Sequence, residues 1–126
     1  MSMLIEGLDH VQVAAPRESE GAMRRFYGEI LGLPEIPKPE TLAGRGGAWF
    51  QLGRQQLHIG VEDGFAPARK AHPAFLVSNL AALRRQIEQA GVAIEEDAPL
   101  PGYVRFYCMD PFGNRLEFLQ PAERKD

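Results

Sequence analysis

The sequence has little of what marks secreted, membrane-spanning or nucleic-acid-binding proteins. Its 126 residues include one cysteine, Cys108, so an intrachain disulfide and a C-x-x-C site are excluded and a reducing cytoplasm is expected. No apolar run approaches the ~20 residues of a membrane-crossing helix, and no basic-then-apolar secretory signal is evident at the N-terminus. A net charge of −3 gives no broad basic face, so neither nucleic acid nor membrane is expected as a partner.

What is present is the composition of one globular domain spanning residues 1–126. Hydrophobic residues make up 44% of the chain and charged residues 25%, as is typical of a folded domain. A chain of this length buries roughly two-thirds of its unfolded surface, which suffices for a hydrophobic core.

The first half of the chain changes between strand-like and helix-like spacing of its apolar residues. Strict alternation of polar and apolar residues favours half-buried strands, and apolar residues recurring every three or four positions favour a helix. A three-residue turn, Gly53-Arg54-Gln55, separates the last two alternating segments. The expected elements are a strand at 9–14, a helix at 18–31, a proline- and glycine-rich loop at 34–47, and strands at 48–52 and 56–61.

The second half repeats this order. Ser78 or Asn79 is expected to cap its helix, and Gly91 to end it. The Asp110-Pro111-Phe112-Gly113-Asn114 segment is a strong turn between two strands. The expected elements are a strand at 72–77, a helix up to residue 90, a short strand at 92–95, and strands at 104–109 and 116–119.

Matched residues in the two halves recur at nearly constant spacing, which indicates an internal repeat. Two pairs are 59 positions apart and a third is 62 apart, a difference that a shorter strand–helix connection absorbs. The pairs are Gly32 with Gly91, His58 with Glu117, and His10 with His72.

Three histidines and one glutamate form a candidate metal site. In a strand, alternate side chains point to opposite faces, and each of these four residues alternates with apolar residues that must cover a helix. A lone strand histidine is usually a hydrogen-bonded, half-buried residue, but every histidine of this chain falls at a repeat-related position. Imidazole and carboxylate suit a divalent first-row ion such as Zn²⁺, Ni²⁺, Fe²⁺, Mn²⁺ or Co²⁺. The predicted ligands are His10, His58, His72 and Glu117.

These residues lie in segments that resemble the vicinal oxygen chelate superfamily, the group of glyoxalases, bleomycin-resistance proteins and dioxygenases. The resemblance covers about residues 4–121, and the D-P-x-G-N-x-x-E-F pattern of 110–118 is its most specific part. The other matching segments are Leu8-Asp9-His10-Val11, Phe26-Tyr27 through Leu31-Gly32-Leu33, Leu57-His58-Ile59 and His72-Pro73-Ala74-Phe75.

The resemblance implies an α+β fold of two βαβββ modules, residues 4–61 and 72–121. The modules are expected to form a curved, eight-stranded mixed sheet around a metal or ligand cavity, and members commonly form homodimers. His10, His72 and Glu117 match metal positions shared by many of the enzymes. His58 matches a fourth position that is often glutamate in glyoxalase I, where that carboxylate takes part in proton transfer, so a histidine puts this role in doubt.

Alternation also predicts which side chains line a substrate pocket. Gln12 shares a face with His10, and Tyr103, Arg105 and Tyr107 share a face in the second half. Arg105 is a candidate for an anionic substrate group or, equally, for a rim salt bridge. Of Trp49 and Phe50 only one can point inward, and comparison of the two hairpins favours Phe50. Cys108 is expected to be a buried small hydrophobe.

Three functions follow as hypotheses. The first is a metal-dependent lyase, isomerase or dioxygenase that binds two oxygens of a small substrate and stabilises an enolate or oxyanion. The second is a metal-free binding or sequestering protein of the bleomycin-resistance type. The third is a ferredoxin-like sandwich without catalytic role, which the matched glycine and histidine spacings disfavour.

Overall fold

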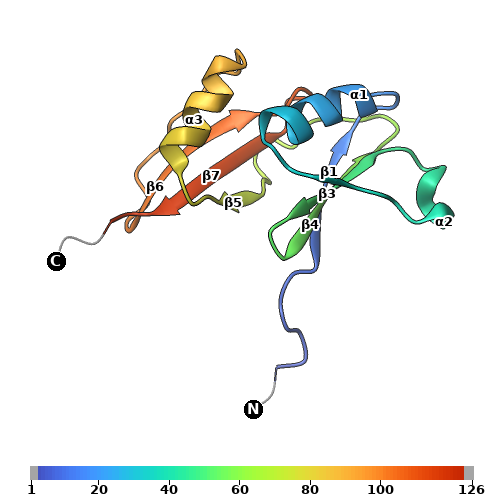
Figure 1. Cartoon of the computed structure of the whole chain (residues 1–126), viewed down its shortest axis with the longest axis horizontal. Helices are drawn as coiled ribbons and strands as arrows, with labels where there is room; N and C mark the ends of the chain where they lie inside the picture. Colours follow the sequence, from blue (N-terminus) through green and yellow to red (C-terminus); the bar gives the residue numbers. More distant parts are fainter. Residues whose placement is uncertain (1–2, 124–126) are drawn as a thin grey trace. The chain divides into compact units, whose positions relative to one another are not determined.

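The computed structural model describes residues 3–123, which divide into two compact units (Figure 1). Unit 1 runs up to Phe65 and unit 2 begins at Ala66. None of the helices within residues 3–123 has the length and apolar character that a membrane crossing demands.

Unit 1 is built on a four-stranded sheet in the order β1-β4-β3-β2. β1 pairs in parallel with β4, whereas β3 pairs antiparallel with both β4 and β2. The strands are β1 (His10–Ala15), β2 (Glu35–Ile36), β3 (Ala48–Leu52) and β4 (Gln55–Val61). Three of them occupy the predicted strand positions, and β2 is an addition inside the predicted loop.

A helical segment covers one face of this sheet (Figure 1). It starts as α1 (Glu20–Met23) and continues as a π-helix, η1 (Arg24–Ile30), so the predicted helix is confirmed but is wider than an α-helix over most of its length. Tyr27 of η1 packs against Phe50 of β3, and both are fully buried. A second short helix, α2 (Glu40–Ala43), lies in the segment predicted as a loop.

Unit 2 repeats this arrangement with a three-stranded sheet in the order β5-β7-β6. β5 pairs in parallel with β7, and β6 pairs antiparallel with β7, so these strands correspond to β1, β4 and β3 of unit 1. The bounds are β5 (Ala74–Leu76), β6 (Tyr103–Met109) and β7 (Arg115–Pro121).

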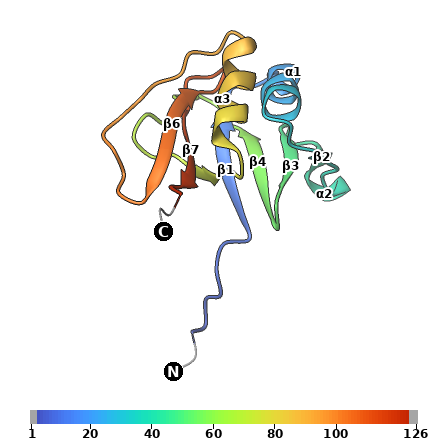
Figure 2. The same cartoon turned by 60° about the vertical axis from the view of Figure 1, so that its left-hand side comes forward.

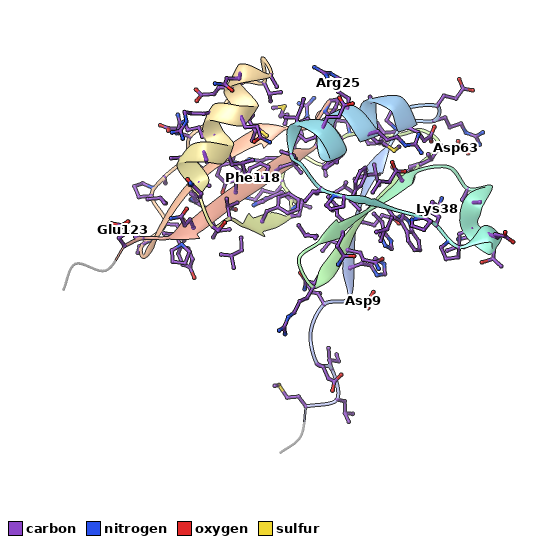
Figure 3. All side chains as sticks on the ribbon, in the orientation of Figure 1. Asp9, Arg25, Lys38, Asp63, Phe118 and Glu123 are labelled. Atoms are coloured by element: carbon purple, nitrogen blue, oxygen red, sulfur yellow. The ribbon has the colours of Figure 1, made fainter. Side chains whose placement is uncertain are left out.

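The helix of unit 2 is α3 (Leu80–Gln89), which lies across the strands β6 and β7 (Figures 1 and 2). The Asn79 side chain accepts a hydrogen bond from the Ala82 backbone N–H, which confirms the predicted capping and satisfies one free donor of the first turn. Phe118, labelled in Figure 3, stacks with Phe106 and packs at a tilt against Phe75, so three aromatic rings contribute to the core of unit 2.

The α+β class and the repeated strand–helix–strand order are therefore confirmed, but the strand count differs from the expected eight. Residues 3–123 contain seven strands in two sheets, because the expected strand at 92–95 is reduced to one bridge between Glu95 and Tyr107. The chain that follows contains Pro99 and Pro101, which have no backbone N–H to donate to a ladder. Figure 2 shows this connection leaving the edge of β6.

Candidate functional site

In unit 2 the structure brings His72 and Glu117 into contact. Glu117 lies on β7 opposite Ala74 of β5, and its backbone N–H donates to the Pro73 carbonyl. His72 lies two residues before Ala74, just outside the strand. Its Nε2 atom is 2.8 Å from Oε1 of Glu117, so two of the four predicted ligands form a direct pair.

The segment before His72 is held by the turn between β6 and β7. The Asn114 side-chain oxygen accepts from the Ala68 N–H at 3.0 Å, and the Ala68 carbonyl accepts from the Arg115 N–H at 2.9 Å. Within the turn, the Asp110 carboxylate accepts from backbone N–H groups of Phe112 and Asn114. The strong turn motif of the sequence thus also fixes the chain that carries His72.

The His72 ring is oriented by the backbone. Its Nδ1 atom lies 2.8 Å from the Lys70 carbonyl oxygen, and because a carbonyl only accepts, Nδ1 must carry a proton. Nε2 donates to the Glu117 carboxylate, so this nitrogen would bind a metal only after it gives up that proton. A second nitrogen fixed in this way is the usual arrangement for histidine that binds a metal.

Two further side chains donate to the Glu117 carboxylate. The Tyr107 hydroxyl is 3.1 Å from Oε1 and Nη1 of Arg105 is 3.3 Å from Oε2. Burial of Glu117 raises the pKa of its carboxyl, but the hydrogen bonds from His72, Arg105 and Tyr107 outweigh burial and lower the pKa overall. The carboxylate is therefore ionised near neutral pH.

Tyr107 lies between two arginines. The Arg105 guanidinium carbon is 5.4 Å from the centre of its ring and that of Arg115 is 3.9 Å away. Burial, followed by the hydrogen bond to Glu117, raises the pKa of the Tyr107 hydroxyl. Arg115 is also paired with Asp97 at 3.0 Å, so this face of unit 2 is densely charged.

The corresponding face of unit 1 is a stack of rings. The His58 ring lies 3.8 Å from that of Trp49, nearly parallel at 2°, and 4.2 Å from that of His10. The Nε2 atom of His58 donates to Gln56 at 2.9 Å. Nδ1 of His10 donates to Asp9, which Figure 3 labels at the start of β1. Burial, and then the neighbouring His10, lower the pKa of His58.

Gln12 lies on the same face, opposite His58 in the β1–β4 ladder. A Cβ atom at Gly60 would come within 2.5 Å of the Gln12 amide nitrogen. Glycine at this position therefore leaves the space that the Gln12 side chain fills.

The predicted orientation of Phe50 is wrong. Phe50 is fully buried against Tyr27 on the helix face, and Trp49 faces His58. The hairpin turns over Gly53 and Arg54, because Leu52 pairs with Gln55, whereas the sequence suggested a three-residue turn. A one-residue change of register moves every side chain of a strand to the other face.

The other predictions about these strands agree with the structure in orientation. Arg105 and Tyr107 share the Glu117 face, and Tyr103, at the start of β6, is 42% exposed. Cys108 is fully buried and its burial raises the pKa of the thiol to about 12, so the small-hydrophobe prediction is confirmed. Trp49 was missed as a face residue, and the correct turn length alone would have identified it.

The predicted ligands lie in two pairs, and the donor atoms of each pair are of a kind that binds divalent metals. No group of three or more His, Cys, Asp or Glu side chains placed to hold a metal ion is found in residues 3–123. The His72–Glu117 pair has an oriented imidazole beside an ionised carboxylate, which suits a first-row ion. The stacked His10 and His58 rings each retain one nitrogen that does not donate in the contacts described above.

Comparisons with known proteins identify relatives along almost the whole chain. The sequence model of the Glyoxalase/Bleomycin resistance protein/Dioxygenase superfamily matches residues 7–118. A search of curated proteins gave no match. Among solved structures, a glyoxalase family protein from Bacillus anthracis is 49% identical, with a TM-score of 0.94 over 97% of this chain and 100% of that chain.

Two more distant structures show the same fold. A lactoylglutathione lyase from Agrobacterium tumefaciens is 19% identical, with a TM-score of 0.72 over 92% of this chain and 94% of that chain. The fosfomycin resistance protein FosX from Listeria monocytogenes is 16% identical, with a TM-score of 0.70 over 98% of this chain and 97% of that chain.

Proposed function

Because the chain belongs to the Glyoxalase/Bleomycin resistance protein/Dioxygenase superfamily, we propose that it is a metal-dependent enzyme acting on a small oxygenated substrate. The reaction class is that of a glyoxalase-like lyase or isomerase, or of a dioxygenase. The observation that carries this proposal is the His72–Glu117 contact at 2.8 Å, with Nδ1 of His72 fixed by a backbone carbonyl. His10, His58, His72 and Glu117 would hold Zn²⁺, Ni²⁺, Fe²⁺, Mn²⁺ or Co²⁺.

The chain's own residues prepare this site. A bound divalent ion supplies Lewis-acid stabilisation of an enolate or oxyanion that forms on a substrate bound through two oxygens. The Lys70 carbonyl selects the His72 tautomer, and the Tyr107 hydroxyl fixes one Glu117 oxygen. Because the pKa of the Glu117 carboxyl is lowered, this side chain acts as a ligand or proton acceptor and not as a proton donor.

A second function is favoured by the number of donors around the same carboxylate. Glu117 receives hydrogen bonds from His72, Arg105 and Tyr107, so its charge is compensated without a metal. A buried carboxylate with such partners is stable. The alternative is therefore a metal-free binding or sequestering protein of the bleomycin-resistance type.

Metal content distinguishes the two functions. Untagged protein purified without chelator should contain close to one equivalent of a first-row transition metal, and the His72→Ala, Glu117→Ala double variant should contain none. Glu88→Gln on α3 is the matched control and should keep the metal. Absence of metal, with no thermal stabilisation by Ni²⁺, Zn²⁺, Mn²⁺ or anaerobic Fe²⁺, would reject the enzyme and favour the binding protein.

The protein is also proposed to act in the cytoplasm, on a small molecule, as a homodimer. The segment before β1 supports dimerisation, since its large apolar side chains are mostly exposed and a cluster of this kind often marks an interface. These residues are Met3, Leu4, Ile5 and Leu8. Light scattering after size-exclusion chromatography should give a dimer mass, and a monomer mass for the wild type would reject this proposal.

A further inference from the structure

Arg105 of β6 reaches three oxygen atoms in unit 2. Nη1 donates to the Tyr107 hydroxyl at 2.8 Å and to Oε2 of Glu117 at 3.3 Å, and Nη2 donates to the Ala98 carbonyl at 2.6 Å. Its side chain is only 17% exposed. Arg105 is therefore a largely buried cation that shares the carboxylate predicted to bind the metal.

The contacts of this guanidinium are incomplete. The Nε–H of Arg105 is buried and has no hydrogen-bond partner among the residues that the structure describes. Nε and Nη2 form the side edge of the guanidinium, which binds both oxygens of a carboxylate in parallel. A buried polar group without a partner requires an explanation, and an oxyanion that displaced the Ala98 carbonyl from this edge would provide the missing acceptor.

The charges around Glu117 give a second, independent reason. Arg105 and Arg115 contribute two positive charges to this face, and Glu117 and Asp97 contribute two negative charges. If Glu117 also served a divalent ion, the face would have a surplus of positive charge, and the ion would compete with Arg105 for the same carboxylate. An anion from outside the protein would restore the balance.

Unit 1 has no cation at the strand position equivalent to Arg105, although Lys38 lies near enough to His58 to contribute to the lowering of its pKa. The β3–β4 and β6–β7 ladders align Trp49 with Tyr107, because their partners His58 and Glu117 are repeat-related. Arg105 then corresponds to Gly47, where a Cβ atom would lie 2.2 Å from the Ile59 carbonyl oxygen. A side chain is excluded at that position, so only unit 2 carries a cation on this strand at the equivalent place.

We propose that Arg105 binds a carboxylate of the substrate when Glu117 serves as a metal ligand. The substrate is thus a small organic anion that carries this carboxylate in addition to the two oxygens held by the metal. This inference rests on the proposed metal-dependent function, and it adds the class of substrate that the site selects.

The test uses two hydroxamates as chelating probes. Succinic acid monohydroxamate ends in a carboxylate, and butanohydroxamate, of the same chain length, ends in a methyl group. Binding of each to the metal-loaded protein is measured by calorimetry for the wild type, Arg105→Met, Arg105→Lys and the control Arg84→Met, with metal content determined for every sample.

The wild type and Arg84→Met should bind the carboxylate probe about tenfold or more tightly than the neutral one, the scale of one charge-assisted pair. Arg105→Met should lose this preference, read as the ratio of the two affinities in each metal-loaded sample, and Arg105→Lys should keep part of it. No preference in the wild type, or an unchanged preference in Arg105→Met, would overturn the role of Arg105 alone. A wild type that takes up no metal would instead overturn the proposed function and this inference with it.

Discussion

The two units place different chemistry on equivalent positions of the same backbone. In unit 1 the face opposite the helix bears stacked aromatic rings and amides, with His58 lying between Trp49 and His10. In unit 2 the equivalent face bears a network of charges around Glu117. The three corresponding strands share their order and their pairing, so on these strands the difference lies in the side chains.

This comparison shows how the predicted ligands of the two units differ in their surroundings. Glu117 is ionised and its partner His72 is already oriented, whereas the imidazoles of unit 1 are stacked and one of them donates to Gln56. Unit 2 therefore presents an ionised carboxylate beside an oriented imidazole, and unit 1 presents imidazole nitrogens beside an aromatic surface. Variants at equivalent positions of the two units can test this division.

The largest expected effect is on the helix faces, where Phe50 in unit 1 corresponds to Cys108 in unit 2. Both side chains are fully buried. Phe50→Ala should lower the free energy of unfolding by about 3–5 kcal/mol, because it leaves a large cavity beside Tyr27, and Cys108→Ala by only ~1 kcal/mol. Urea unfolding of both variants, with Phe50→Leu as an intermediate, measures the difference. Equal losses of stability in the two variants would contradict this difference between the two cores.

The second-largest expected effect concerns Glu117 and His58, which occupy equivalent positions on the faces that point away from the helices. Glu117→Ala should lower the free energy of unfolding of the metal-free protein by ~2–3 kcal/mol, because Arg105 and Tyr107 lose a buried acceptor. His58→Ala in unit 1 should cost less, ~1 kcal/mol, since it removes ring stacking and one hydrogen bond. Measurement in the presence of chelator separates this effect from metal binding. A larger loss for His58→Ala would contradict the contrast between a charged and a neutral face.

The sequence predicts these two faces only in part, and the outcome depends on which sequence signal each prediction rested on. Alternation and repeat spacing identify most of the strands, because one-sided burial imposes a period of two. They predict that His72 and Glu117 lie close together as two of four gathered ligands, and this pair is in contact. They fail at Phe50, because the side of a strand depends on a turn length that several residues at 53–55 could satisfy. Alternation also places Arg105 and Tyr107 on one face, but the contact of Arg105 with Ala98 depends on the path of the connection before β6, which no spacing in the sequence encodes.

A third test addresses the turns that join the last two strands of each unit. Asn114 is almost fully buried and binds both Ala68 and Asp110, whereas Arg54 lies at the exposed tip of the β3–β4 turn. Asn114→Ala should cost ~1–2 kcal/mol, since it leaves buried partners unpaired, and Arg54→Ala less than ~0.5 kcal/mol. Thermal unfolding measures both. If Asn114→Ala were as mild as Arg54→Ala, the turn would not be what holds the chain before His72.

The smallest expected effect is a difference between the two faces in how their contribution to stability depends on pH. His58 has a folded-state pKa below its ordinary 6.5, mainly through burial. Glu117 has a folded-state pKa below its ordinary 4.5. In each case the unfolded chain binds more protons between the two values, so stability must fall as pH decreases. The contribution of His58 is present above pH 6.5 and is lost as the pH falls through its folded pKa, and that of Glu117 is lost in the same way below pH 4.5.

Acidification should therefore weaken unit 1 before unit 2 in the metal-free protein. Urea midpoints measured from pH 8 to pH 3 should fall in two steps; His58→Asn should remove the upper step, and Glu117→Gln the lower one. Trp49, the only tryptophan of the chain, stacks on His58 and reports the upper step by its fluorescence, because protonation places a cation against the indole. Since unit 2 has no tryptophan, the lower step should leave that signal unchanged. A fluorescence change that follows the lower step, or one that persists in His58→Asn, would mean that the two faces do not titrate separately.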